Sequence, residues 1–388
     1  MELGPTRTGC IIKKPEGHVM NRSFTIKFIS ALPVIIIFAA LSFLPQKTYA
    51  QLGDVGDFLN SGVEDGQLLL GEYLKPFADG FGAGLNTGWV DRANAHGFLG
   101  FHVKINTAVA FVPDARQRFD LSELDFSTIN RIEGGPVTPT FSGSSSTDVR
   151  LAHEVEGLRL ADFRMPPGTG QHVIATPMIQ GGVGVFGDTE IMARFVPTVK
   201  ILDYGEIYLY GLGIKHELNQ WLPGGALLPV TFSLMAGYTV FGASAGLDSR
   251  PDDYNPDNDQ IQSGLGGPEH PVWDDQEVSF TTNAYTVNFF VGRSLPILSV
   301  YAGAGFEASS TSINVDGRYP FYVLTQEDGE PVRKLTSLDD PIDISIDGAN
   351  SFRALAGVRI SLPLVTFNVD YTLADYHMIS AGLGISMR

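Results

Sequence analysis

The sequence predicts an all-β protein: an antiparallel transmembrane β-barrel with a short N-terminal helical plug or cap. Three observations support this fold. Apolar and polar side chains alternate by twos near the C-terminus, an export signal stands at the N-terminus, and long and short connections sort to opposite ends of the strands. We expect about twelve strands, within a range of about ten to fourteen.

The alternation is clearest in the last part of the chain. From 352 to 362 the even positions are apolar and the odd ones charged or small, with Leu355 as the exception, and Pro363 ends the run. The runs 367–373 and 379–387 alternate in the same way. Side chains of a strand point to opposite faces, so each run has an apolar and a polar face, which is typical of strands between lipid and a lumen. A soluble β-sandwich with one buried face is the alternative.

Residues 1–50 have the layout of a secretory signal peptide. A basic region, an uncharged apolar stretch and a small-residue cleavage site follow one another, at 22–27, 28–44 and 48–50. We therefore expect cleavage between Ala50 and Gln51, with Met20 as the true start. A membrane-spanning anchor is the alternative, and a proline within the apolar stretch argues against it.

Charge and cysteine content exclude several functions. The formal net charge is −17, and residues 1–50 hold more bases than acids, so the remainder is more acidic still. Such a chain repels the phosphates of nucleic acids. The single cysteine, Cys10, precedes the signal, which excludes disulfides, thiol catalysis and thiolate metal sites in the mature chain. The expected partners are outer-membrane lipid and lipopolysaccharide, together with small hydrophobic solutes.

The segment 51–80 differs from the rest. Apolar residues recur at spacings of three and four between Asp54 and Asp79, which predicts one or two short amphipathic helices. We expect this segment to plug the lumen or cap the periplasmic mouth, while packing outside the barrel end is the alternative. The barrel itself is expected to span 81–388. The glycine-rich run 81–90 fits either a first strand or the end of the plug.

The connections provide an independent check. Counting back from a periplasmic C-terminus, short turns at 187–188, 219–225, 294–296 and Pro363 fall on one side. The long segments 113–171, 242–277 and 317–350 fall on the other side. Outer-membrane barrels have this arrangement, with the long loops outside the cell. The strand-like runs add up to an odd number, so either 81–90 joins the plug, giving about ten strands, or the long segments hide further strands, giving about twelve.

Aromatic residues at or near strand ends are a weaker sign of the same architecture. Barrels carry aromatic girdles at the two membrane interfaces. The residues in question are Trp89, Tyr204, Trp221, Tyr285, Tyr301, Phe367, Tyr371 and Tyr376.

Five charged residues interrupt otherwise alternating strands: Arg194, Lys215, Arg353, Arg359 and Asp370. A charge on the lipid face at mid-bilayer costs roughly 2–4 kcal/mol, so these side chains should line the lumen. There they would either set the selectivity of a channel or form structural ion pairs in a closed barrel. Both interpretations stay open.

No catalytic, cofactor or metal site is expected, and the protein is not predicted to be an enzyme. The run 242–246 matches the nucleophile-elbow pattern around Ser244, but the sequence after it cannot form the helix that the elbow requires. The histidines lack metal-ligand spacing, and the aspartates of 248–259 lack the pattern of an EF-hand loop. A solvated acidic loop is favoured, with cations bridging it to lipopolysaccharide as the alternative.

Several stretches resemble a domain-of-unknown-function family of secreted, outer-membrane-like proteins from Gram-negative bacteria. They are 73–77 (YLKPF), 86–89 (NTGW), 96–101 (HGFLGF), 111–113 (FVP), 194–197 (RFVP), 208–216 (YLYGLGIKH) and 221–223 (WLP). A looser likeness, in layout only, is to fatty-acid-transporter-like outer-membrane barrels. The resemblance implies a location in the cell outer membrane, and it supplies no activity that could be carried over to this chain. Two functions remain: passive passage of small or hydrophobic molecules, or a non-conducting structural or surface-binding barrel that displays acidic extracellular loops.

Overall fold

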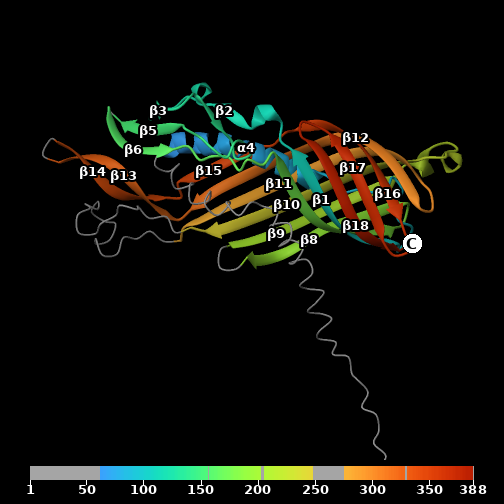
Figure 1. Cartoon of the computed structure of the whole chain (residues 1–388). Helices are drawn as coiled ribbons and strands as arrows, with labels where there is room; N and C mark the ends of the chain where they lie inside the picture. Colours follow the sequence, from blue (N-terminus) through green and yellow to red (C-terminus); the bar gives the residue numbers. More distant parts are fainter. Residues whose placement is uncertain (1–61, 156, 202–204, 248–274, 328–329, 388) are drawn as a thin grey trace, which may run out of the picture.

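The computed structural model describes residues 62–155, 157–201, 205–247, 275–327 and 330–387. In this part of the chain, ten antiparallel strands pair into a closed ring (Figure 1). In ring order they are β1 (Phe101–Phe111), β7 (Val173–Val185), β8 (Thr189–Ile201), β9 (Gly205–Glu217), β10 (Thr231–Gly246), β11 (Glu277–Ser294), β12 (Leu298–Asp316), β16 (Ser351–Ser361), β17 (Thr366–Leu373) and β18 (His377–Met387).

The ring closes between the first and last strands. β1 pairs with β7 on one edge and with β18 on the other, so that Phe101 faces both Val183 and Met387. Every neighbouring pair is antiparallel. The predicted antiparallel barrel is thus confirmed, with ten ring strands in place of the expected twelve. The difference arises because the short strands of the long connections do not enter the ring.

The two faces of the ring differ in polarity as the alternation predicts. On β17, Phe367, Val369 and Leu373 are exposed, whereas Asn368 and Asp370 are buried. Ten or more further large apolar side chains point outward in the same way from the other strands. A water-soluble barrel would place its apolar side chains inside, so the inverted pattern is that of a wall between lipid and a polar lumen.

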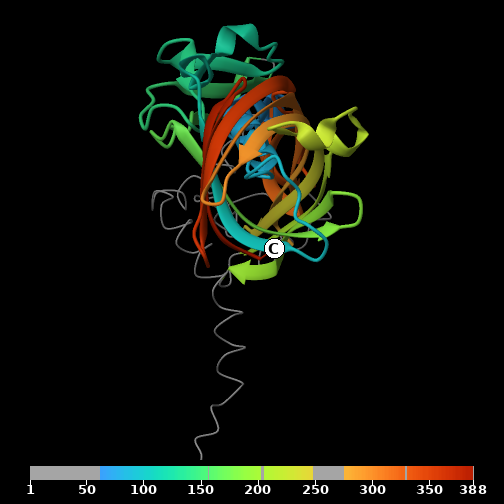
Figure 2. The same ribbon diagram turned by 90° about the vertical axis from the view of Figure 1, so that its right-hand side faces the viewer.

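The interior of the ring is occupied by one helix, α4 (Val63–Asn86), visible inside the barrel in Figure 2. From Ala78 to its end every residue of α4 is buried. The helix can approach the wall because its second half is rich in glycine. A Cβ on Gly82 would lie 2.6 Å from the Cβ of Ser309, and one on Gly84 would lie 2.8 Å from the Cβ of Thr176.

The glycine-rich run 81–90 is therefore the end of a helix and the bend behind it, and one of its two expected assignments, a first strand, is wrong. The expected boundary between plug and barrel at 80 falls inside α4. No helix among the described residues is long and apolar enough to cross a membrane.

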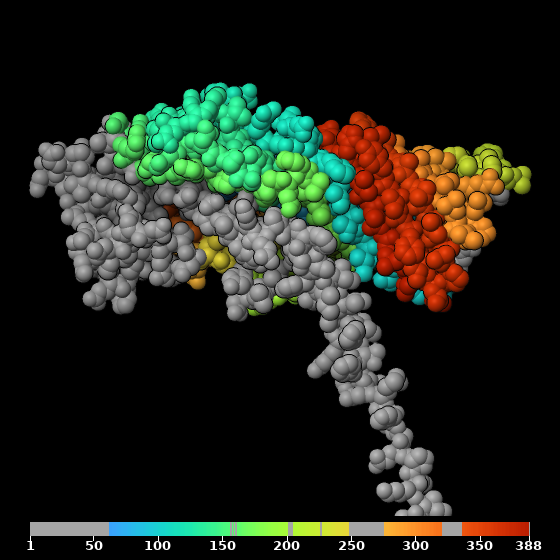
Figure 3. Space-filling view, viewed as in Figure 1, coloured from blue at the N-terminus to red at the C-terminus, as the bar shows by residue number. Residues whose placement is uncertain are grey.

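The connection between β1 and β7 folds into a cap over the outer half of α4. It contains β2 (Arg118–Asp120), β3 (Ile129–Glu133), β4 (Val137–Pro139), β5 (Arg150–Val155) and β6 (Leu158–Arg164), with 3-10 turns at Asp114–Arg116 and Leu121–Glu123. In the space-filling view these residues gather over one end of the molecule (Figure 3). Leu69, Leu70 and Tyr73 of α4 pack with the cap in an apolar core.

The connection between β12 and β16 adds a hairpin and a short strand: β13 (Arg318–Glu327), β14 (Glu330–Asp339) and β15 (Ile342–Asp347). β15 pairs with the end of β12 beyond β16 and so prolongs the wall. Most of the third long segment, 248–274, lies outside the described residues. The turns at 187–188, 218–230, 295–297 and 362–365 lie at the opposite end of the ring, as the alternation of strand directions requires.

Candidate functional site: the filled lumen

The N-terminal segment 63–100, called the plug below, passes through the lumen from one end to the other. At the cap end, the Asp65 carboxylate accepts hydrogen bonds from the backbone N–H groups of Ser127 and Thr128, at 2.9 and 2.7 Å. At the far end, the backbone N–H of Leu99 donates to the carbonyl of Gly184, at 2.9 Å, just before β1 begins. The plug is thus held at both mouths of the barrel.

Two arginines from opposite parts of the wall hold the C-terminal end of α4. Arg194 on β8 donates to the carbonyls of Leu85 and Thr87, the latter at 2.7 Å. Arg353 on β16 donates to the Asn86 carbonyl at 3.0 Å. The last turn of α4 contains no basic residue of its own. The wall therefore supplies the positive charge that a helix C-terminus favours, and it also bonds carbonyls that the helix leaves unpaired.

Arg353 is also neutralised within the wall. Its guanidinium lies 2.8 Å from Glu307 on β12, and both side chains are 2% exposed. A buried charge without a partner is strongly destabilising. Arg353 can therefore be buried against the helix because Glu307 pairs with it.

An ion pair joins the plug to the wall beyond the C-terminal end of α4. Arg359 on β16 lies 3.0 Å from the Asp91 carboxylate. Burial alone would raise the pKa of Asp91, but the charges of Lys104 and Arg359 outweigh it and hold this pKa below its usual range. Asp91 is therefore ionised at neutral pH, and the pair acts as a charged clasp on the plug.

Residues 87–96 form no regular structure inside the lumen, so their backbone groups need wall partners. Gln180 donates to the Trp89 carbonyl at 2.8 Å, Tyr301 to that of Val90 at 3.3 Å, and Lys215 to that of Arg92 at 3.3 Å. The wall is thus matched to this one path of the chain.

Trp89 is the apolar anchor of the same stretch. Its ring lies 3.7 Å from the Arg194 guanidinium, a cation–π contact. The indole rests on Gly213 and Gly237, where a Cβ would lie 2.7 Å from ring atoms. Trp89 is 3% exposed, so its expected place in an interfacial aromatic girdle is wrong, as it is for the buried Tyr301 and Tyr376.

Asp370 lies beside a small cavity. Its carboxylate lies 3.3 Å from the Tyr301 hydroxyl, whose one proton is shared between this carboxylate and the Val90 carbonyl. The cavity, bordered also by Trp89, Asn288 and Arg353, has room for about one water molecule. The plug therefore leaves little free volume around it here.

The turn at the far mouth brings two histidines and a glutamate together. His96 of the plug, His102 of β1 and Glu190 of β8 are all buried, and Lys215 contacts the same carboxylate at 3.1 Å. Burial lowers the pKa of His96, against the opposing effect of Glu190. Of the described residues, this group could hold a metal ion.

The five charged residues singled out in the strands, Arg194, Lys215, Arg353, Arg359 and Asp370, all lie inside the ring, between 1% and 4% exposed. Three acidic residues pair with them: Asp91 with Arg359, Glu190 with Lys215 and Glu307 with Arg353. These acids are not among the residues predicted from the sequence, although a search for acidic residues at inward strand positions would find the two that lie on strands. Ser244 lies within β10, paired on both sides. The predicted cleavage site at Ala50 and Gln51 lies outside the described residues.

No curated protein matches the chain in sequence. Similar solved structures include the outer-membrane protease OmpT of Escherichia coli, at 10% identity over 74% of this chain and 97% of that one, with a TM-score of 0.27. The translocator domain of the autotransporter NalP of Neisseria meningitidis shares 10% identity over 76% and 90%, with a TM-score of 0.28. Ail of Yersinia pestis shares 9% over 75% and 98%, with a TM-score of 0.22.

TM-scores this low carry no argument about the fold, so the assignment of a barrel rests on the observed pairing of the strands. In sequence, a family model described as a family of unknown function (DUF6588) matches residues 27–387. This confirms the resemblance to a domain-of-unknown-function family. The chain belongs to the DUF6588 family.

Proposed function

We propose that this protein is an outer-membrane β-barrel closed by its own N-terminal segment, and that it serves as a non-conducting scaffold that presents its long connections outside the cell. The observation that carries the proposal is the path of the plug. It crosses the whole lumen, and wall side chains bond its backbone from Leu85 to His96.

The outer surface supports a membrane setting. Large apolar side chains such as Phe289, Val300 and Leu383 are 43–49% exposed on the ring. In water a contiguous apolar belt of this extent promotes association, whereas in lipid it is solvated. The polar lumen and the short turns at one end agree with the same setting.

Planar-bilayer recording of the purified, heat-modifiable protein tests the closed state. We expect no steady conductance, because the plug and its partners leave space of about one water molecule beside Trp89. Stable open-level currents from the unmodified protein, scaling with protein concentration, would overturn the proposal. Recovery of the protein in the soluble fraction would overturn its membrane part.

Gated passage is the second candidate, and the polarity of the plug–wall interface favours it. The ion pair of Asp91 with Arg359 and the bond from Arg353 to the Asn86 carbonyl join groups that water can solvate once the plug and the wall separate. Passage would then require displacement of the plug. Urea pulses that open a reversible conductance in the unmodified protein, below the concentration that abolishes heat modifiability, would favour gating over a permanent scaffold.

A further inference from the structure

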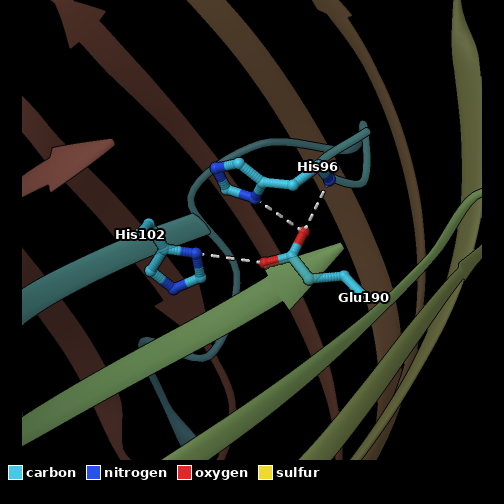
Figure 4. Close-up of side chains that lie close together, drawn as sticks. All are labelled: His96, His102 and Glu190. Carbon is cyan, nitrogen blue, oxygen red and sulfur yellow. Dashed lines mark hydrogen bonds and ion pairs between the residues drawn. The ribbon is translucent and has the colours of Figure 1, made fainter. Parts of the chain in front are cut away.

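The cluster at the far mouth of the barrel has the composition of a transition-metal site. His96, His102 and Glu190 come from the plug, β1 and β8, and converge as Figure 4 shows. His96 Nδ1 lies 3.1 Å from Glu190 Oε2, and His102 Nδ1 lies 3.2 Å from Glu190 Oε1. All the candidate ligand atoms lie within 4.8 Å of one another.

These separations are close to those of a bound set. Ligands at the usual Zn–N and Zn–O lengths, about 2.0–2.2 Å in a tetrahedral site, lie roughly 3.3 Å apart. The two nitrogen–oxygen separations, 3.1 and 3.2 Å, are close to this value, and each runs to a different oxygen of the carboxylate. Shifts of about an ångström in the side chains would bring the remaining atoms within reach.

The surroundings hold the rings in place. His96 Nε2 lies 3.0 Å from the Ser386 hydroxyl, so one ring nitrogen is engaged while Nδ1 faces the carboxylate. Metal-binding histidines usually have such an outer partner for the second nitrogen. His102 is 4% exposed; its Nδ1 faces Glu190, and its Nε2 makes no hydrogen bond within the described part of the chain. Gly182, opposite His102 on β7, leaves room for this ring, since a Cβ there would lie 2.4 Å from it.

The two oxygens of the Glu190 carboxylate have different neighbours. Oε2 accepts the backbone N–H of His96 at 3.1 Å and contacts Lys215 Nζ, also at 3.1 Å. Oε1 faces only His102 among these groups. A cation seated toward Oε1 would meet His102 directly. It would draw His96 Nδ1 across from Oε2, where Lys215 keeps its place.

We propose that His96, His102 and Glu190 bind one divalent transition-metal ion, zinc by its preference for imidazole and carboxylate, and that this ion fastens the end of the plug to two strands of the wall. The proposal does not depend on whether the barrel conducts. It identifies a ligand set that sequence spacing could not show, because its three members come from separate elements.

Metal content and spectroscopy test the site directly. The heat-modifiable protein in detergent is freed of metal with a chelator, given Zn²⁺ or Co²⁺, dialysed, and measured by elemental analysis. We expect one ion per chain, and Co²⁺ visible absorption of four- or five-coordinate character. Folded protein that retains less than a tenth of an equivalent would overturn the proposal.

Variants assign the ligands. His102→Asn and His96→Asn should each weaken Zn²⁺ binding at least about tenfold in calorimetry, whereas His377→Asn, which removes a histidine outside the cluster, should leave it unchanged. Heat modifiability is measured for each variant so that only folded protein is compared. Equal affinity in all three variants would mean that the ion binds elsewhere and would overturn the assignment. If a cluster variant does not fold, Co²⁺ absorption of the unmodified protein without imidazole-ligand features decides against the site.

Discussion

The two halves of the plug differ in what holds them besides apolar packing. The outer half of α4 packs Leu69, Leu70 and Tyr73 into an apolar core formed with the cap. The inner half and the segment behind it are held by Arg194 and Arg353 on the carbonyls and by Arg359 on Asp91. One continuous segment thus passes from a core like that of a soluble domain into a lumen where apolar packing is joined by buried charges and hydrogen bonds.

The difference follows from what surrounds each half. The cap lies beyond the ring, where burial of apolar area is the main stabilising effect. In the ring most large apolar side chains face outward, and the inward positions mix apolar residues such as Met178 with polar residues such as Asn368 and Thr372. The part of α4 inserted there packs Phe81 and Leu85 against inward apolar side chains of the wall, and it also depends on side-chain bonds to its C-terminal carbonyls.

The largest expected effect comes from breaking the charged lumen. Arg353→Ala leaves Glu307 ionisable, buried and unpaired, and removes a donor from Asn86. We expect a loss of about 3–5 kcal/mol in the free energy of unfolding, measured by urea titration of the heat-modifiable band. Arg150→Ala removes an exposed pair with Asp162 in the cap and should change stability by under about 1 kcal/mol. Equal effects of the two variants would contradict the distinction between lumen and cap.

A cavity in the cap should act locally. Leu69 is fully buried, so Leu69→Ala should destabilise the cap by about 2–5 kcal/mol. We expect faster proteolysis between β1 and β7 with the barrel band still heat-modifiable. Leu68, which is 40% exposed, supplies the control: Leu68→Ala should change the proteolysis rate little. Loss of the barrel band in Leu69→Ala would show that the two regions unfold together.

The smallest expected effect concerns the boundary between the regions, at Asp79. Burial raises the pKa of this carboxyl from 3.8 to about 6, and Tyr376 is its hydrogen-bond partner at 3.5 Å. Between pH 4 and 6 the Asp79 carboxyl is protonated in the folded state but ionised in the unfolded state. The free energy of unfolding therefore falls as pH rises through this range, and the loss is complete above pH 6. Asp79→Asn should therefore be more stable than the unmodified protein by about 2 kcal/mol at pH 8 and equal to it at pH 4. A variant less stable at pH 8 would show that the carboxylate is needed in its charged form.

The sequence predicts the ring better than its contents. Alternation in 352–362 and 367–373 assigns faces correctly because one lipid face and one polar face impose a period of two. It leaves 81–90 undecided between a strand and the end of the plug, because the glycines there weaken an isolated helix and yet allow close approach to Ser309 and Thr176. It also missed His96, His102 and Glu190, since only the closure of the ring brings these three residues together.

The central claim, that the N-terminal segment occupies the lumen, is tested most directly by a cysteine pair. Asn94 of the plug and Ser294 at the end of β11 share a hydrogen bond of 2.6 Å, and Cys10 is the only native cysteine. In Asn94→Cys/Ser294→Cys, recovered from outer membranes, we expect a disulfide that changes the mobility of the boiled, unreduced band. Asn94→Cys/Arg293→Cys, with the second cysteine on the outward face next to Ser294, should not cross-link. A folded Asn94→Cys/Ser294→Cys protein whose thiols both stay free to alkylation would contradict the filled lumen.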